Sequence, residues 1–115
     1  VKYKADLTAK SEVPANDSAG SGTADITVDT EAKTISWKVD AKDLTGDATA
    51  AHFHGPAKDG ENAPPAIDIS GNWKEGSAEL TDEQRKQIED GQMYINVHTA
   101  KFPDGEIRGQ VVKAQ

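Results

Sequence analysis

The sequence predicts an all-β domain: a Greek-key-like antiparallel β-sandwich or barrel of about seven to eight strands with one short surface helix. Three observations predict this class. Short segments of alternating apolar and polar residues recur along the chain of 115 residues, and loops rich in Gly, Pro, Ser and Asn separate them. A single segment carries helix signals. A chain of this length builds one core, so residues 1–115 are expected to form one domain.

The first half of the chain contains four predicted strands. They cover residues 1–9, 23–29, 34–41 and 50–54. The short polar segment 29–33 between the second and third predicts a hairpin. Alternation gives each strand an inward set of apolar residues. These sets are Val1, Tyr3, Ala5 and Leu7; Ala24, Ile26 and Val28; Ile35, Trp37, Val39 and Ala41; and Ala51 and Phe53.

The second half contains three more predicted strands and the helix. The strands cover residues 66–70, 93–99 and 106–113, and residues 71–77 are expected to be a turn region. The helix is expected at 81–90, with Thr81 as N-cap, Gln84 at the capping-box position and Gly91 at the stop. Leu80 and Ile88 are its clear apolar contacts, which indicates a short surface helix.

Composition excludes several classes of protein. The formal net charge of −7 argues against nucleic acid and anionic membrane surfaces as partners, because no basic patch exists to displace counterions. The chain has no cysteine, so disulfides, thiolate catalysis and cysteine zinc sites are excluded. No apolar run approaches the roughly 18–20 residues that span a bilayer, so no membrane span is expected.

The three histidines are the candidate metal ligands. His52 and His54 are two apart in a strand, so both imidazoles face the same side, about 7 Å apart. Because Ala51 and Phe53 face the core, this side is the polar one. In residues 93–99 the same phase puts Tyr94, Asn96 and His98 on the polar side. If the two strands are neighbours, one outward face carries all three histidines; otherwise each histidine is simply solvated.

Imidazole nitrogen suits copper, zinc, nickel and iron. Three histidines with an open fourth position are typical of a reactive site rather than a closed structural one. The last strand adds Glu106 and Arg108 to the polar face, where a cross-strand ion pair is the simplest interpretation. Trp37 and Trp73 are expected in the core or at its edge. The loop acids Asp43, Asp47, Asp59 and Glu61 lack EF-hand spacing and are expected to be solvated.

Several motifs of this chain resemble the CHRD domain family, the domain repeated in chordin and present as single copies in many bacterial proteins. The matching segments are residues 7–14 (LTAKSEVP), 22–24 (GTA), 51–57 (AHFHGPA), 91–99 (GQMYINVHT) and 102–110 (FPDGEIRGQ). The resemblance implies a periplasmic or secreted location. It implies little about activity, because the family is defined by its domain and not by a reaction.

A second resemblance, limited to a ligand pattern, is to copper–zinc superoxide dismutase, a β-sandwich family. His52 and His54 look like its H-x-H pair and His98 like its late copper ligand, while Arg108 is a candidate for the arginine that steers the anion. The bridging histidine, the zinc ligands and the disulfide cysteines of that family are missing here. The resemblance therefore implies a single ion, copper first, with zinc or another divalent metal as the alternative.

Two hypotheses follow from the sequence. In the first, the chain is a periplasmic or secreted copper-binding β-sandwich, serving copper storage, delivery or tolerance. If it is an enzyme, superoxide dismutation is the natural reaction, although the net charge of −7 opposes an anionic substrate. In the second, it is a non-catalytic extracellular interaction module whose partner is another protein or a second copy of the chain.

Overall fold

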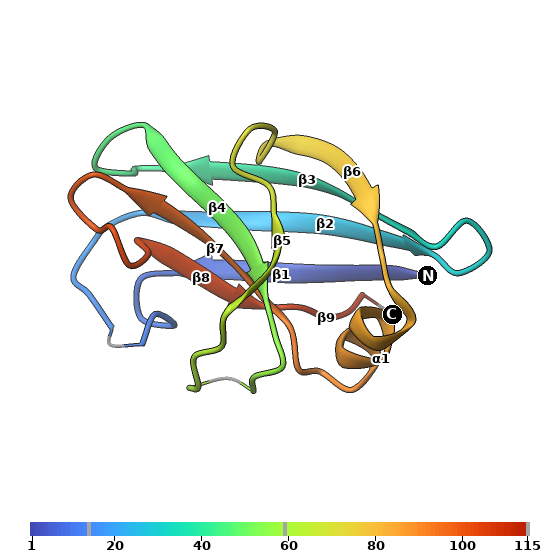
Figure 1. The fold of residues 1–115 in the computed structure, drawn as a ribbon. Coiled ribbons are helices and arrows are strands. Elements are labelled where there is room, and N and C mark those ends of the chain that lie inside the picture. Colours follow the sequence, from blue (N-terminus) through green and yellow to red (C-terminus); the bar gives the residue numbers. More distant parts are fainter. Residues whose placement is uncertain (14, 59, 115) are drawn as a thin grey trace.

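The computed structural model describes residues 1–13, 15–58 and 60–114, which form a nearly closed antiparallel sheet with one helix (Figure 1). Its strands are β1 (Lys2–Thr8), β2 (Ser21–Asp29), β3 (Thr34–Lys42), β4 (Ala48–His54), β5 (Pro65–Asp68), β6 (Glu75–Glu79), β7 (Tyr94–Thr99), β8 (Ile107–Gln110) and β9 (Val112–Lys113), and its helix is α1 (Asp82–Glu89). The strand order is β5-β4-β7-β8-β1-β2-β3-β6, with β9 beside β1. The all-β prediction with one short helix is confirmed.

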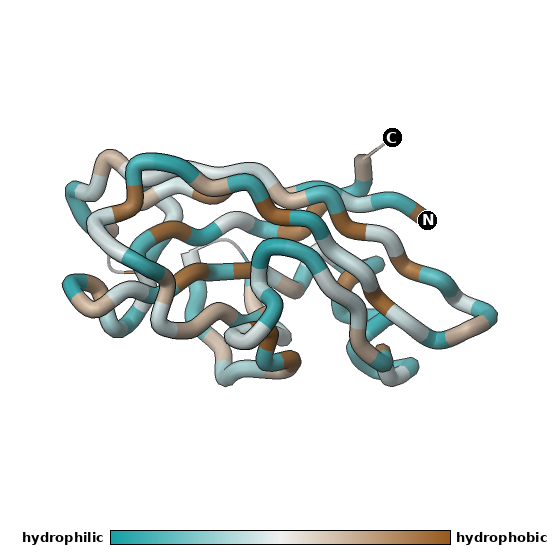
Figure 2. Tube along the Cα trace, turned by 90° about the horizontal axis from the view of Figure 1, so that it is seen from above, coloured by the Kyte–Doolittle hydropathy of each residue, from teal (hydrophilic) through white to brown (hydrophobic). Residues whose placement is uncertain are grey.

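The core lies between two layers of the sheet. In Figure 1, β4, β5, β7 and β8 cross the layer formed by β1, β2, β3 and β6. Trp37 of β3 meets Phe53 of β4 edge to face, with ring centroids 5.7 Å apart. Figure 2 shows apolar and polar positions alternating along the strands. The predicted inward residues are buried, except that Val1 is 58% exposed and Ala41 is only partly buried.

Two strand predictions need correction. Residues 71–77 were expected to be a turn, but β6 begins at Glu75 and pairs with β3, Ser77 lying opposite Ser36. The strand β6 consists of small and charged residues and lies at the edge of the sheet, so it has no alternating apolar residues that would predict it. The last predicted strand is divided into β8 and β9 at Val111, whose amide donates to Met93 O. Trp73 packs at the edge of the core.

The helix α1 follows the sequence signals closely. The Thr81 side chain accepts from the Gln84 amide, and the Gln84 side chain accepts from the Thr81 amide, so both capping-box bonds form. Ile88 is its buried residue, and Gly91 has a φ of +72°, a left-handed conformation that favours glycine. At eight residues, α1 is too short to cross a bilayer, and no other helix occurs in the described ranges.

The two histidine strands are neighbours, which the site requires. β4 pairs with β7, so His52 lies opposite Asn96 and His54 opposite Tyr94. β7 pairs on its other side with β8, where Asn96 lies opposite Arg108. The polar sides of β4, β7 and β8 therefore form one continuous face.

Alternation alone suggests that this face is open to solvent, but three loops cover most of it. We call them the N-terminal loop (residues 11–13 and 15–18), the middle loop (57–58 and 60–63) and the C-terminal loop (100–105). The Asn62 side chain of the middle loop donates to Val13 O, and Asn16 donates to Gly105 O, so the loops are linked. With the core on its other side, β7 is therefore buried at all six of its residues. Asp59, one of the loop acids, lies outside the described residues.

Candidate metal centre

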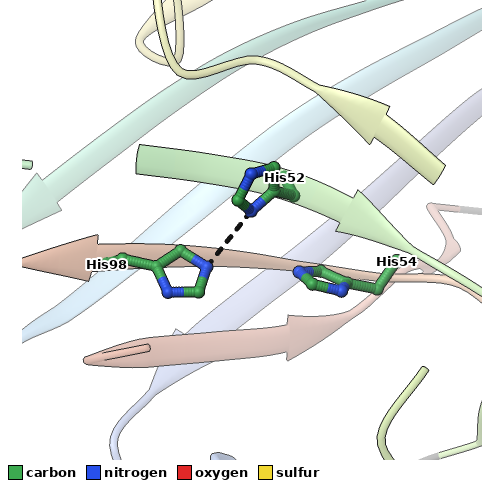
Figure 3. A group of neighbouring side chains, drawn as sticks. All are labelled: His52, His54 and His98. Carbon is green, nitrogen blue, oxygen red and sulfur yellow. Dashed lines mark hydrogen bonds between the residues drawn. The ribbon is translucent and has the colours of Figure 1, made fainter. Parts of the chain in front are cut away.

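The three histidines come together on the covered face, and Figure 3 shows their rings grouped above β4 and β7. One nitrogen of each ring can be chosen so that all three lie within 4.8 Å of one another. The ring centroids of His52 and His98 are 5.1 Å apart, and those of His52 and His54 are 5.3 Å apart. The pairing of Ala50 with His98 places the His98 ring diagonally across from His52.

Backbone carbonyls orient two of the rings. His54 Nδ1 lies 2.9 Å from Ala63 O, and His98 Nδ1 lies 2.9 Å from Pro103 O. A carbonyl oxygen can only accept, so Nδ1 of each ring carries the proton and donates. In the neutral ring, Nε2 is then left with a free lone pair. Histidines that bind metals commonly donate their other ring N–H to a carbonyl or carboxylate in this way.

His52 is oriented by its two neighbours. Its Nδ1 lies 3.2 Å from His98 Nε2, toward the centre of the cluster. On the opposite side its Nε2 lies 3.7 Å from an Asp68 carboxylate oxygen on β5. The Asp68 carboxyl is exposed, and hydrogen bonds from Ser70 lower its pKa, so it is ionised beside the ring. Each of the three imidazoles thus has one nitrogen facing an oxygen acceptor outside the cluster.

Burial sets the protonation of two of these rings. Burial lowers the pKa of His54, against the opposing effect of its bonds to Ala63 and Asn96. Burial likewise lowers the pKa of His98, against the bond to Pro103 O. Both rings are therefore neutral at neutral pH, which is the form that binds a metal ion.

An aromatic stack supports His54 from the side. The His54 and Tyr94 rings are nearly parallel, at 6°, with centroids 4.7 Å apart. The Arg108 guanidinium carbon lies 3.4 Å from the centre of the Tyr94 ring. Because β4 and β8 flank β7 on opposite sides, Tyr94 lies between His54 and Arg108. Stacking of this kind fixes both the ring and the cation.

Arg108 also fastens the middle loop. It is 1% exposed, and it donates to Asn62 Oδ1 and Lys58 O. Ala63, whose carbonyl orients His54, follows directly after Asn62. A role for Arg108 in steering anions remains a prediction. Arg108 does not line the groove that opens beside His54 and His98.

The expected ion pair between Glu106 and Arg108 is wrong. Glu106 lies before β8 and accepts hydrogen bonds from Ser18, Thr45 and Thr99 instead. Burial alone would raise the pKa of Glu106, but these bonds outweigh it and lower the pKa. Hydrogen-bond donors therefore stabilise the negative charge of this carboxylate, while the Tyr94 ring and a carbonyl and an amide oxygen accommodate the Arg108 cation. Alternation could not identify the partners of either residue.

The model of the CHRD domain family matches residues 3–111, nearly the whole chain. The chain belongs to the CHRD domain family. No similar curated protein and no similar solved structure was found for this CHRD domain, so the ligand pattern shared with copper–zinc superoxide dismutase gains no support.

The donor set of this CHRD domain fits a single transition-metal ion. Two nitrogens bound to one ion at 2.0–2.1 Å lie about 3.3 Å apart in a tetrahedral site and at most about 4.2 Å apart. The 3.2 Å between His52 Nδ1 and His98 Nε2 matches the tetrahedral value. A pair of donors at the 4.8 Å limit would need to approach by about 0.6 Å on binding.

A groove of about 440 Å³ opens beside the histidines of the CHRD domain. Its lining includes His54, His98 and Asn96, together with Tyr94 and residues from all three covering loops. The one charged residue that the described lining contains is Asp104, a carboxylate at the edge of the C-terminal loop. A path lined this way favours a cation over an anion.

Several residues of the centre had no sequence signal. Carbonyl groups of Ala63 and Pro103 orient the rings, and any residue type supplies a carbonyl. Asp68 reaches His52 from β5, whose neighbour could not be inferred from alternation. Asn96 was placed on the correct face by its phase, but its 2.8 Å contact with His54 Nε2 depends on the register of β4 with β7.

Proposed function

We propose that this CHRD domain binds one metal ion through His52, His54 and His98, and that copper is the preferred metal. The observation that carries the proposal is the common orientation of the rings. Each ring turns one nitrogen toward the cluster and the other toward an oxygen acceptor outside it. Sites rich in nitrogen ligands bind Cu(II) more tightly than other divalent ions of the first row.

Holding or delivering the metal ion fits the surroundings better than superoxide dismutation. Asp104 lines the groove, Asp68 lies beside His52, and the whole chain carries a net charge of −7. An anionic substrate is repelled by such a field, whereas a metal cation is attracted. Arg108, the candidate to offset this charge, is buried behind Tyr94.

We place the domain in the periplasm or outside the cell, in keeping with the setting that the family resemblance implies. There the neutral imidazoles would hold the ion, and acidification would release it, because a protonated imidazole cannot bind a metal. Reversible binding of this kind serves storage, delivery or tolerance of copper.

Titration of the metal-free protein with Cu(II), Cu(I) and Zn(II) tests the proposal. We expect one ion per chain, with Cu(II) binding more tightly than Zn(II). His52→Ala, His54→Ala and His98→Ala should each weaken binding by about 100-fold or more, because each removes a ligand rather than a supporting group. Asp25→Asn on β2, in the other layer of the sheet, is the matched control for metal ions attracted by surface charge.

Unchanged affinity in all three histidine variants would exclude the site. A dismutase assay on the same samples separates binding from catalysis. Activity that rises with copper loading and disappears in His98→Ala would instead favour the enzyme hypothesis.

A further inference from the structure

Asn96 makes the closest polar contact with the histidine cluster. Its side chain is 3% exposed and lies between His52 and Arg108 in the strand ladder. Its Oδ1 atom lies 2.8 Å from His54 Nε2, the nitrogen that the Ala63 carbonyl leaves free. The contact is buried on the metal side of the ring.

The tautomer of His54 decides the chemistry of this contact. His54 Nδ1 donates its proton to Ala63 O, so the neutral ring offers a lone pair at Nε2. The amide oxygen of Asn96 offers lone pairs as well. Two electron-pair donors that face each other in a buried place repel unless a proton or a metal ion lies beside them.

The separation of the two atoms also suits two ligands of one ion. For metal–ligand distances of about 2.0–2.2 Å, ligands of one ion lie about 2.8–3.5 Å apart at angles near 90–110°. Amide oxygens are established ligands of divalent cations. The Asn96 contact of 2.8 Å and the His52–His98 contact of 3.2 Å both fall in this range.

We propose that Asn96 Oδ1 is the fourth ligand of the metal centre, which makes it a four-coordinate site of three nitrogens and one oxygen. This inference rests on the proposed function. Sites with four protein ligands hold a metal ion, whereas catalytic sites keep one position for water or substrate. A hard oxygen ligand also favours Cu(II) and Zn(II) over the softer Cu(I). Asn96 therefore sets both the closure of the site and its preference for divalent ions.

Asn96→Ala and Asn96→Asp test the proposal, with Asn72→Ala in an exposed turn as the matched control. We measure affinity for Cu(II), Zn(II) and Cu(I), the visible absorption of bound Co(II) and the electron paramagnetic resonance spectrum of bound Cu(II). Asn96→Ala should weaken Cu(II) and Zn(II) binding by about tenfold or more and change both spectra, with little effect on Cu(I). Asn96→Asp should restore tight divalent binding with a spectrum different from that of the wild type.

Unchanged affinity and spectra in Asn96→Ala would overturn the proposal, and so would tighter binding, which would identify the amide as a group that blocks His54. Should Asn96→Ala fail to fold, unchanged spectra in Asn96→Asp would overturn it. If the wild type binds no metal ion, the proposed function fails together with this inference. If the wild type binds and the Asn96 variants match it, this inference fails alone.

Discussion

The two faces of the β4–β7 pair are both buried, but by different means. On the inner face, Ala51, Phe53, Ile95 and Val97 pack against the opposite layer of the sheet. On the outer face, His54, Asn96 and His98 are covered by loops that contact them through hydrogen bonds. Apolar contact stabilises the inner face whatever the details of its neighbours. The burial of the outer face depends on particular hydrogen-bond donors and acceptors, and this face contains the candidate metal ligands.

The outer face also contains polar atoms without partners. Glu12 Oε2 and Arg108 Nε are both buried and make no hydrogen bond among the described residues. Such groups reduce stability, since each has lost water without gaining a partner. Removing a side chain should therefore cost more stability on the inner face than on the outer face, where neutralising a buried charge can even stabilise the protein.

The largest effect is expected on the inner face. Phe53→Ala removes a fully buried ring that packs against Trp37, and it should reduce the free energy of unfolding by about 3–5 kcal/mol. His54→Ala, on the next residue but the other face, should reduce it by only about 1–2 kcal/mol, since it loses hydrogen bonds and little apolar contact. Urea unfolding of the metal-free variants measures both. Equal losses would contradict the contrast between the faces.

Glu12→Gln should stabilise the protein above neutral pH. Burial raises the pKa of the Glu12 carboxyl to about 7; Arg108 opposes the rise and Asp104 adds to it. The folded state therefore holds this proton more tightly than the unfolded chain, and stability falls as the pH rises toward 7.

At pH 8 the variant should exceed the wild type by on the order of 2–3 kcal/mol. The two proteins should be similar at pH 4, where Glu12 is protonated in both states. Unfolding by urea across this pH range measures the difference. A difference between the two proteins that does not depend on pH would show that Glu12 acts through packing alone.

Arg108→Met tests whether Arg108 holds the middle loop in place. The change keeps the length of the side chain but removes the donors to Asn62 Oδ1 and Lys58 O, which should cost about 2 kcal/mol. Affinity for Zn(II) should fall as well, because the loop that orients His54 through Ala63 is loosened. Arg85→Met on exposed α1 is the control, and it should leave metal affinity unchanged. Metal affinity in Arg108→Met equal to that of the control would remove Arg108 from the support of the site.

The smallest effect is expected for the stability of the metal-free protein at acidic pH. Burial lowers the pKa of His54 and His98, so below pH 6.5 the unfolded chain binds protons that the folded protein does not. Stability of the metal-free protein should therefore decrease slightly as the pH falls below 6.5. Urea unfolding at a series of pH values measures this. The free energy of unfolding should fall more steeply with decreasing pH for the wild type than for His98→Gln. Saturating Zn(II) should delay the loss to lower pH.

Much of the fold could be predicted because alternation is a local property. The inward residues of β1, β2, β3 and β7 follow from the spacing of apolar side chains alone. Strand β6 could not be predicted in this way, since an edge strand needs no apolar set and exists through its pairing with β3. The sequence thus predicts which side a residue faces, but not what covers that side.

The same distinction explains the site. His52, His54 and His98 could be grouped because their phase puts them on one face, and the pairing of β4 with β7 then brings them together. The partners of Arg108 and most partners of Glu106 could not be predicted, because they come from loops distant in sequence. Covering a polar face requires specific long-range hydrogen bonds, and no local pattern encodes these.

The carbonyl groups that orient His54 and His98 have a consequence for how such a site can change over time. Every amino acid has a backbone oxygen, so positions 63 and 103 can exchange side chains freely while the path of the loop is kept. An insertion or deletion of one residue in either loop would turn a ring without altering a ligand. Loop length, rather than the side chains at these two positions, then sets how each ring is turned, so two domains with the same three histidines would differ in metal affinity through loop spacing alone.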